Sequence, residues 1–334
     1  MAVAARLDRF QRKHPAAAFP LAVVYKFIDD NGGYLAALIA YYGFVSLFPL
    51  LLLLATVLGF VLVGHPDLQQ RVLQSALHQF PVVGGQLQDP KRIGGGGFGL
   101  TVGVLGSLYG GLGVAQALQY AMNSAWAVPR NERPNPLLGR LRGLMLLGTA
   151  GLAIIGTTVL TALSGSGGSF GPVLRAFALA ASVVLNAVVF VFVFRIAVAR
   201  PLSTRDVAPG AIAAAVIWQL LQSFGIFYVG RVVKNASATN GVFALVLGLL
   251  AFFYLTAIAV VLSVEINVVR VNRLHPRSLL TPFTDNVVLT PGDRRAYSKQ
   301  AEAEQMKGFE DVDVQFDQPS PDGEAGSVES HRQE

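Results

Sequence analysis

Polar side chains recur on one face of an otherwise apolar segment in the first half of the chain. Gln116, Gln119, Tyr120 and Asn123 follow one another at spacings that bring them onto one continuous face of a helix. Buried amides need partners, so in a membrane this face points into a helix bundle or a water-filled cavity and not at lipid. Two interpretations are open: the amides line a substrate path, or they form interhelical hydrogen bonds that contribute about 0.6 kcal/mol each.

Isolated polar residues also occur in other apolar segments. Pro49 lies within such a segment, where it removes one helix hydrogen bond and predicts a kink or break close to Ser46. Broken helices mark the binding sites of many transporters, and ordinary kinked membrane helices are common as well. The predicted substrate-path residues are Tyr42, Ser46, Pro49, Gln116, Gln119, Asn123, Asn186, Gln219 and Gln222.

An acidic residue follows directly after the last apolar segment. Glu265 falls at the C-terminal end of the helix predicted there, where the helix dipole disfavours a negative charge. We therefore expect either an ion pair with Arg195, Arg270 or another arginine of the same side, or exchange of a proton. The predicted coupling or gating residues are Glu265, Asn267 and Arg195.

Residue patterns typical of enzymes are missing from the chain. It has no cysteine, and its five histidines are scattered without the spacing that metal sites require. Nucleotide-binding and serine-hydrolase motifs are missing as well. We therefore expect a protein that is not an enzyme and that has no metal or cofactor.

The elements that position these residues are long and uncharged. Six stretches of 19 to 37 residues contain no Asp, Glu, Lys, Arg or His. An apolar helix of about 20 residues spans the hydrocarbon core of a bilayer, where a backbone must satisfy its own hydrogen bonds. The sequence therefore predicts an all-α membrane protein with six transmembrane helices in one bundle, at about 36–63, 98–127, 143–163, 176–195, 207–229 and 241–265.

The basic residues predict the orientation of this bundle. Alternate connections hold 15 Lys and Arg on one side against 6 on the other, which places both termini in the cytoplasm. The net charge of +6 then reflects membrane topology and anionic lipid head groups, and no nucleic-acid partner is expected. Residues 1–33 form a basic cytoplasmic segment, 34–266 the membrane domain, and 267–334 a cytoplasmic tail that we predict to be acidic and disordered after about residue 285.

Two further features concern the first two membrane helices. The external connection His65–Arg92 has apolar residues at helical spacing and predicts an amphipathic helix between helices 1 and 2. Two GxxxG spacings, Gly99–Gly103 and Gly106–Gly110, let another helix approach closely. We interpret them as packing contacts, with sliding of one helix past another as the alternative.

Four motifs in order resemble the YihY/BrkB family of bacterial inner-membrane proteins over about residues 20–280. They are LAALIAYYGFVSLFPLLLLL from Leu35, ALQYAMNSAW from Ala117, GAIAAAVIWQLLQSFGIFY from Gly210, and the segment from Asn240 that ends in Glu265 and Asn267. The family usually has Tyr-Gly where this chain has Asn240-Gly241.

The resemblance implies a multi-pass protein of the inner membrane that is associated with envelope integrity. One branch of the family has a proposed role in lipid or lipopolysaccharide export, and an older ribonuclease label is widely regarded as mistaken. Together with the polar faces, this favours a protein that transports or accommodates a lipid-like or amphiphilic envelope component, with membrane lipids as its partners. The alternative is a non-transporting membrane scaffold.

Overall fold

The described part of the chain is helical throughout. The computed structural model describes residues 2–61, 96–164, 171–228, 238–279, 281, 284 and 287–317, and these contain no strand. Ten elements follow in order: α1 (Ala2–Lys13), α2 (Pro15–Asp29), α3 (Gly32–Val61), α5 (Gly96–Ala125), the 3-10 turn η2 (Arg130–Glu132), α6 (Pro136–Ser164), α7 (Gly171–Ala197), α8 (Thr204–Tyr228), α9 (Ala238–Val271) and α10 (Pro291–Glu302). The predicted all-α class is confirmed.

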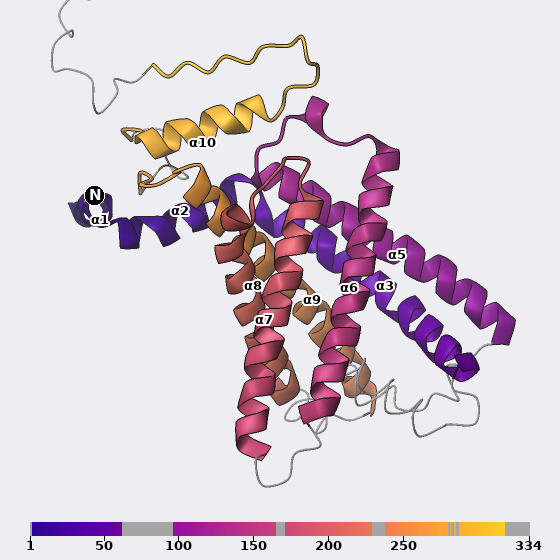
Figure 1. Cartoon of the computed structure of the whole chain (residues 1–334). Helices are drawn as coiled ribbons and strands as arrows, with labels where there is room; N and C mark the ends of the chain where they lie inside the picture. The colour runs from indigo at the N-terminus through magenta and orange to yellow at the C-terminus, as the bar shows by residue number, and fades with distance from the viewer. Residues whose placement is uncertain are drawn as a thin grey trace, which may run out of the picture.

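Six long helices, α3 and α5 to α9, form one bundle (Figure 1). Within the described residues, four of their segments are long and apolar enough to cross a membrane: Thr101–Ala125, Leu179–Ala197, Thr204–Gly225 and Val246–Val271. Gly32–Leu47 in α3 is apolar but shorter. The count of six spans and the cytoplasmic location of both termini stay predictions, and the amphipathic helix predicted in His65–Arg92 lies outside the described residues.

Glycines allow α3 and α5 to pack closely along their length. Three glycines of α5 face side chains of α3 so closely that none of them has room for a Cβ atom. The pairs are Gly106 with Pro49, Gly110 with Ser46, and Gly113 with Tyr42. The prediction that the Gly106–Gly110 spacing serves helix packing is therefore confirmed, with α3 as the neighbouring helix.

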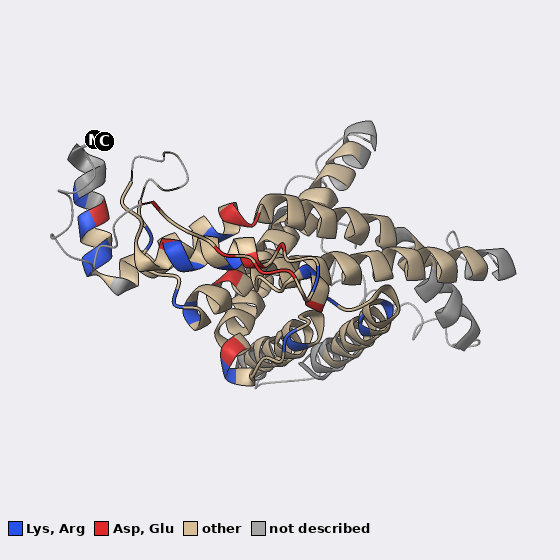
Figure 2. Cartoon of the chain, turned by 90° about the horizontal axis from the view of Figure 1, so that it is seen from above, with Lys and Arg blue, Asp and Glu red and all other residues tan. Residues whose placement is uncertain are grey.

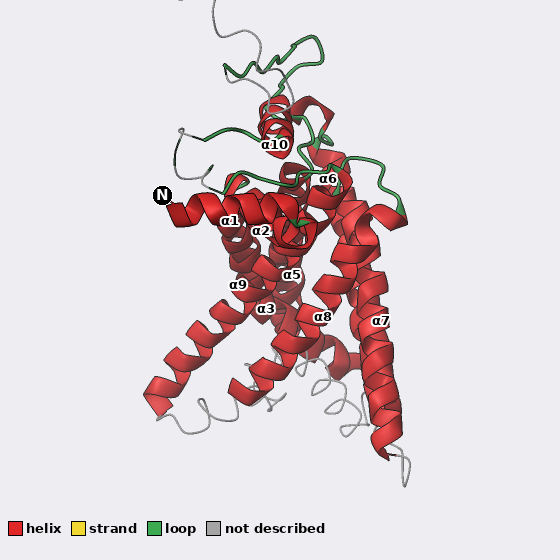
Figure 3. Cartoon of the chain, turned by 90° about the vertical axis from the view of Figure 1, so that its left-hand side faces the viewer, coloured by secondary structure: helices red, strands yellow, loops and turns green. Residues whose placement is uncertain are grey.

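The charged residues gather at one end of the bundle. There α1 and α2 lie across the ends of the long helices, and α10 covers them (Figure 3). Seen from this end, Lys, Arg, Asp and Glu cluster while the long helices beyond are nearly free of them (Figure 2). We call this region, with α2, η2 and α10, the charged end.

The prediction of disorder after about residue 285 is wrong for residues 287–317, which include α10. Thr290 and Asp293 form a reciprocal capping box at its start, with Pro291 in the first turn. The buried Asp293 also forms an ion pair with Arg277, which in turn bonds Asp29 at the end of α2 at 2.9 Å. The acidic composition suggested a solvated tail, but one of its carboxylates is a buried anchor. Residues 318–334 lie outside the described part.

Candidate functional site

Glu265 is fully buried in α9 near the charged end, with an exposed fraction of 0%. Neither of its carboxyl oxygens has a hydrogen bond of normal geometry. Lys26, Asp30 and Asp29 are the charged groups that interact with it. A buried carboxyl without hydrogen bonds is costly unless a cation or a proton neutralises it.

The cation beside Glu265 comes from the N-terminal helix α2. Lys26 is 4% exposed and forms an ion pair with Asp30, one turn further along the chain. Burial by itself lowers the pKa of Lys26, but the carboxylates of Glu265 and Asp30 outweigh it and raise the pKa above the ordinary value of 10.5. Burial raises the pKa of Asp30, and Lys26 opposes that effect. One lysine thus faces two carboxyls, so one carboxyl lacks a cation of its own.

The predicted pairing of Glu265 with an arginine is therefore wrong. Arg195 is exposed at the end of α7, where its Nε donates to the carbonyl of Leu202 at 3.0 Å. Arg270 donates instead to backbone carbonyls at the start of α8, including that of Asp206 at 3.2 Å. The charged groups that act on Glu265 come instead from α2 and the residue that follows it.

Asn267 joins α9 to the start of α8. Its Oδ1 accepts from the backbone N–H of Gly210 at 2.8 Å, and its Nδ2 donates to the carbonyl of Val207 at 3.1 Å. A Cβ atom on Gly210 would overlap the backbone carbonyl of Ser263 and the amide of Asn267. Asn267 therefore joins α9 to α8 through two hydrogen bonds.

The amide residues of α5 line a polar pocket at the charged end. This α5–α6 pocket has a volume of 230 Å³ and is lined by Gln116, Gln119, Tyr120, Asn123, Arg133, Pro134, Asn135, Pro136, Gly139 and Arg140. Gln119 donates to the carbonyl of Gly139 at 3.0 Å and so ties α5 to α6. Asn123 accepts from the backbone N–H of Ala199 at 2.7 Å. The predicted interhelical hydrogen bonding is confirmed for Gln119, which joins α5 to α6. A substrate path along this face stays a prediction, although the same residues line a cavity.

The other predicted path residues do not join this pocket. Tyr42, Ser46 and Pro49 pack against α5, where Ser46 donates to the carbonyl of Gly43 at 2.9 Å. Asn186, Gln219 and Gln222 are half-buried on α7 and α8. Of the predicted path residues, the described lining of the α5–α6 pocket thus brings together Gln116, Gln119 and Asn123.

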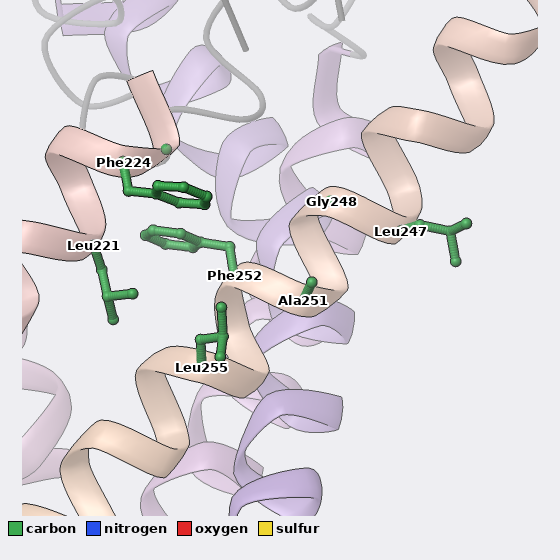
Figure 4. A pocket seen from close by; sticks show the side chains of 8 residues that line it. Leu221, Phe224, Leu247, Gly248, Ala251, Phe252 and Leu255 are labelled. Carbon is green, nitrogen blue, oxygen red and sulfur yellow. The ribbon is translucent and has the colours of Figure 1, made fainter. Parts of the chain in front are cut away.

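Sequence reasoning missed an apolar groove between α8 and α9. This α8–α9 groove has a volume of 280 Å³ and is lined by Leu221, Phe224, Gly225, Leu247, Gly248, Ala251, Phe252 and Leu255. In Figure 4, the rings of Phe224 and Phe252 are turned toward one another across the gap between the helices. The small residues Gly248 and Ala251 leave this space open. The sequence did not predict the groove, because these two residues lie in a segment that is apolar throughout and shows no distinguishing pattern.

Comparisons with known proteins agree with the helical architecture. A family model described as virulence factor BrkB matches residues 23–285, which include the Lys26–Asp30–Glu265 cluster. The inner membrane protein YhjD of Escherichia coli (strain K12) is 25% identical over 276 residues, 75% of this chain and 80% of that protein. YfkH of Bacillus subtilis (strain 168), named as a ribonuclease-like protein, is 26% identical over 260 residues, 73% of this chain and 90% of that protein.

No solved structure matches the chain significantly. The family predicted from the four sequence motifs is confirmed by a match that covers most of the chain, from α2 to beyond α9. Its long apolar helices and its similarity to an inner membrane protein make it an integral membrane protein. The chain belongs to the virulence factor BrkB family.

Proposed function

We propose that this protein binds and transports, or at least accommodates, a lipid-like or amphiphilic component of the bacterial envelope. In this proposal it is a multi-pass protein of the inner membrane with six spans, both termini lie in the cytoplasm, and no reaction is catalysed. Membrane lipids are its partners, and no cofactor takes part.

The α8–α9 groove is the observation that supports this proposal. A dry apolar cavity of about 150 Å³ can hold a benzene molecule. The groove offers 280 Å³, and its lining side chains are all hydrocarbon. Phe224, Leu247 and Leu255 on its rim are exposed by 59%, 62% and 44%, so the groove is accessible from outside the bundle. Its size and chemistry suit a segment of an acyl chain.

Filling the groove tests the proposal. Ala251→Phe places a phenyl ring in the gap, whereas Leu250→Phe places the same ring one position away on the exposed surface of α9. We expect Ala251→Phe to retain about tenfold less co-purified lipid per protein, since excluding only two methylene groups costs about 1.6 kcal/mol. In a strain that lacks the native protein, it should also fail to restore the envelope permeability barrier.

Leu250→Phe should behave like the wild type in both measurements. If Ala251→Phe is expressed normally and equals both the wild type and Leu250→Phe in retained lipid, the groove holds no acyl chain and the proposal loses its support. Lipid is quantified by mass spectrometry of the extracted, detergent-purified protein.

A scaffold without transport is the second candidate. Residues 303–317 continue beyond α10 at the charged end, with Phe309 and Met306 exposed by 90% and 56%. Deletion of residues 306–334 removes this surface and leaves the buried Asp293 anchor of α10 in place. A scaffold that uses this segment should lose its binding partners, whereas a lipid-handling protein should keep the permeability barrier intact.

A further inference from the structure

The described lining of the α5–α6 pocket carries a net positive charge. Its described lining includes Arg133 and Arg140 but no Asp or Glu. Neither arginine forms an ion pair with a described residue, whereas the neighbouring Arg130 pairs with Glu304 at 2.6 Å. Because guanidinium groups stay charged at all physiological pH values, the pocket lining holds two cations. The nearby carboxylate of Glu304 acts on Arg133 from outside the described lining and forms its ion pair with Arg130.

Arg133 is held in place by contacts that occupy only part of its guanidinium group. Its Nε donates to the carbonyl of Val128 at 3.1 Å, and its guanidinium carbon lies 5.4 Å from the ring centre of Tyr120. Burial, the largest effect, and Arg130 lower the pKa of Arg133, against the opposing influence of Tyr120 and Glu304. A positioned, partly desolvated guanidinium with unused N–H groups is suited to bind an oxyanion.

Asn123 adds a neutral donor to the same pocket. This side chain is only 3% exposed, and its Oδ1 is used by the backbone of Ala199. Its Nδ2 group is the donor end of the same amide, on a residue that lines the pocket. The N-terminus of α6 begins at Pro136 in the pocket wall, and its partial positive charge acts in the same direction.

The pocket borders an apolar surface. Leu137, Leu138 and Leu141 of α6 alternate with pocket residues along the chain and are exposed by 76%, 50% and 50%. A soluble anion would gain nothing from contact with this apolar surface. A lipid would bind to both parts, because its head group requires a polar pocket and its acyl chains require an apolar surface next to it.

We propose that the α5–α6 pocket binds the phosphate-bearing head group of an anionic membrane lipid, with Arg133 and Arg140 as its cationic ligands. The acyl chains of this lipid lie along the exposed leucines of α6. This inference goes beyond the proposed function and stands or falls separately, because the pocket shares no lining residue with the α8–α9 groove.

Binding of soluble short-chain lipids tests the inference. Dihexanoyl phosphatidylglycerol, dihexanoyl phosphatidylcholine and inorganic phosphate are titrated into the full-length protein in phosphatidylcholine nanodiscs, with calorimetric detection. We expect the anionic lipid to bind at least tenfold more tightly than either of the other two. Inorganic phosphate shares the head-group charge but lacks chains, and the zwitterionic lipid has chains but no net charge.

Two kinds of variant locate the site. Replacing both Arg133 and Arg140 with Gln removes the charge, and Gly139→Leu fills the pocket without altering charge, because the structure leaves open space at this glycine. Each should weaken binding of the anionic lipid at least tenfold. Arg130→Gln and Gly148→Leu are the matched controls, since both positions lie outside the pocket and Gly148 also has open space; both should bind within twofold of the wild type.

Three results would overturn the inference. Unchanged affinity in a normally folded Gly139→Leu variant excludes the pocket, and this holds even where the double arginine variant fails to fold. Equal affinity for inorganic phosphate would indicate a free anion as the ligand. Equal affinity for the zwitterionic lipid would show that the two arginines do not select charge.

Discussion

Removal of the Lys26 ammonium group probes the buried cluster directly. Lys26→Met keeps an unbranched side chain but leaves Glu265 and Asp30 without the cation that acts on both of them. Breaking a buried pair by removing one partner typically costs about 3–5 kcal/mol. Because whole domains are stable by only about 5–15 kcal/mol, this loss is large and measurable.

A double-mutant cycle separates charge from packing. Glu265→Gln alone should cost little, since Lys26 keeps its ion pair with Asp30. In the Lys26→Met background the same change should recover at least about 1 kcal/mol, because it removes a buried charge that has lost its partner. Lys13→Met on the exposed surface of α1 is the control and should stay within about 0.5 kcal/mol of the wild type.

The pH dependence gives a second check on the same variant. A buried carboxyl without a counter-ion escapes its cost by binding a proton. The deficit of Lys26→Met relative to the wild type should therefore shrink between pH 8 and pH 5. Unfolding in mixed micelles is followed by tryptophan fluorescence, for which the buried Trp126 is a natural probe.

A stability of Lys26→Met within 1 kcal/mol of the wild type at pH 8 would refute this reasoning. A coupling energy below about 0.5 kcal/mol between the two sites would do the same. A small coupling energy would mean that Lys26 serves Asp30 alone. A small cost of Lys26→Met would mean that neither carboxyl depends on the lysine.

Two other predictions concern stability. Gly210→Ala should destabilise the protein by about 3 kcal/mol, because the added Cβ atom meets the backbone carbonyl of Ser263. Gly148→Ala is the control: the space around this glycine is open, so in the same unfolding assay it should be neutral or stabilise α6 by up to about 1 kcal/mol. Equal effects of the two variants would contradict the close packing of α8 on α9. Because the pKa of Lys26 is raised in the folded protein, its contribution is complete below the ordinary value of 10.5 and is lost as pH rises through the higher folded value. Lys26→Arg keeps its charge in that window, so its stability should fall less steeply above pH 10.5 than that of the wild type, and parallel curves would exclude Lys26 as the titrating group.

Part of the candidate site could be predicted from the sequence. The spacing of Gln116, Gln119 and Asn123 predicted one polar helix face, and these residues do line one pocket. The spacing could not show that Arg133 and Arg140 complete this pocket, because they lie in a connection and in the next helix. Their position depends on how the chain turns between α5 and α6.

The partner of Glu265 shows the same limit. The charge at a helix end predicted a cation nearby, and Arg195, Arg270 and other arginines of the same side were the candidates. Lys26 stands almost at the other end of the chain, and only the packing of α2 across α9 brings it to Glu265. The Thr290–Asp293 capping box, in contrast, was present in the sequence as a local signal, but the acidic composition around it favoured disorder.

The sequence by itself determined that this is a helical membrane protein, because the backbone of each long uncharged stretch satisfies its hydrogen bonds in hydrocarbon by forming a helix. The resemblance of four motifs indicated the BrkB family. Tertiary structure alone decided which charges meet, where the two pockets open, and that α10 is ordered. Those outcomes depend on contacts between residues far apart in the chain. Such contacts arise from shape and burial, which no local pattern of residue types contains.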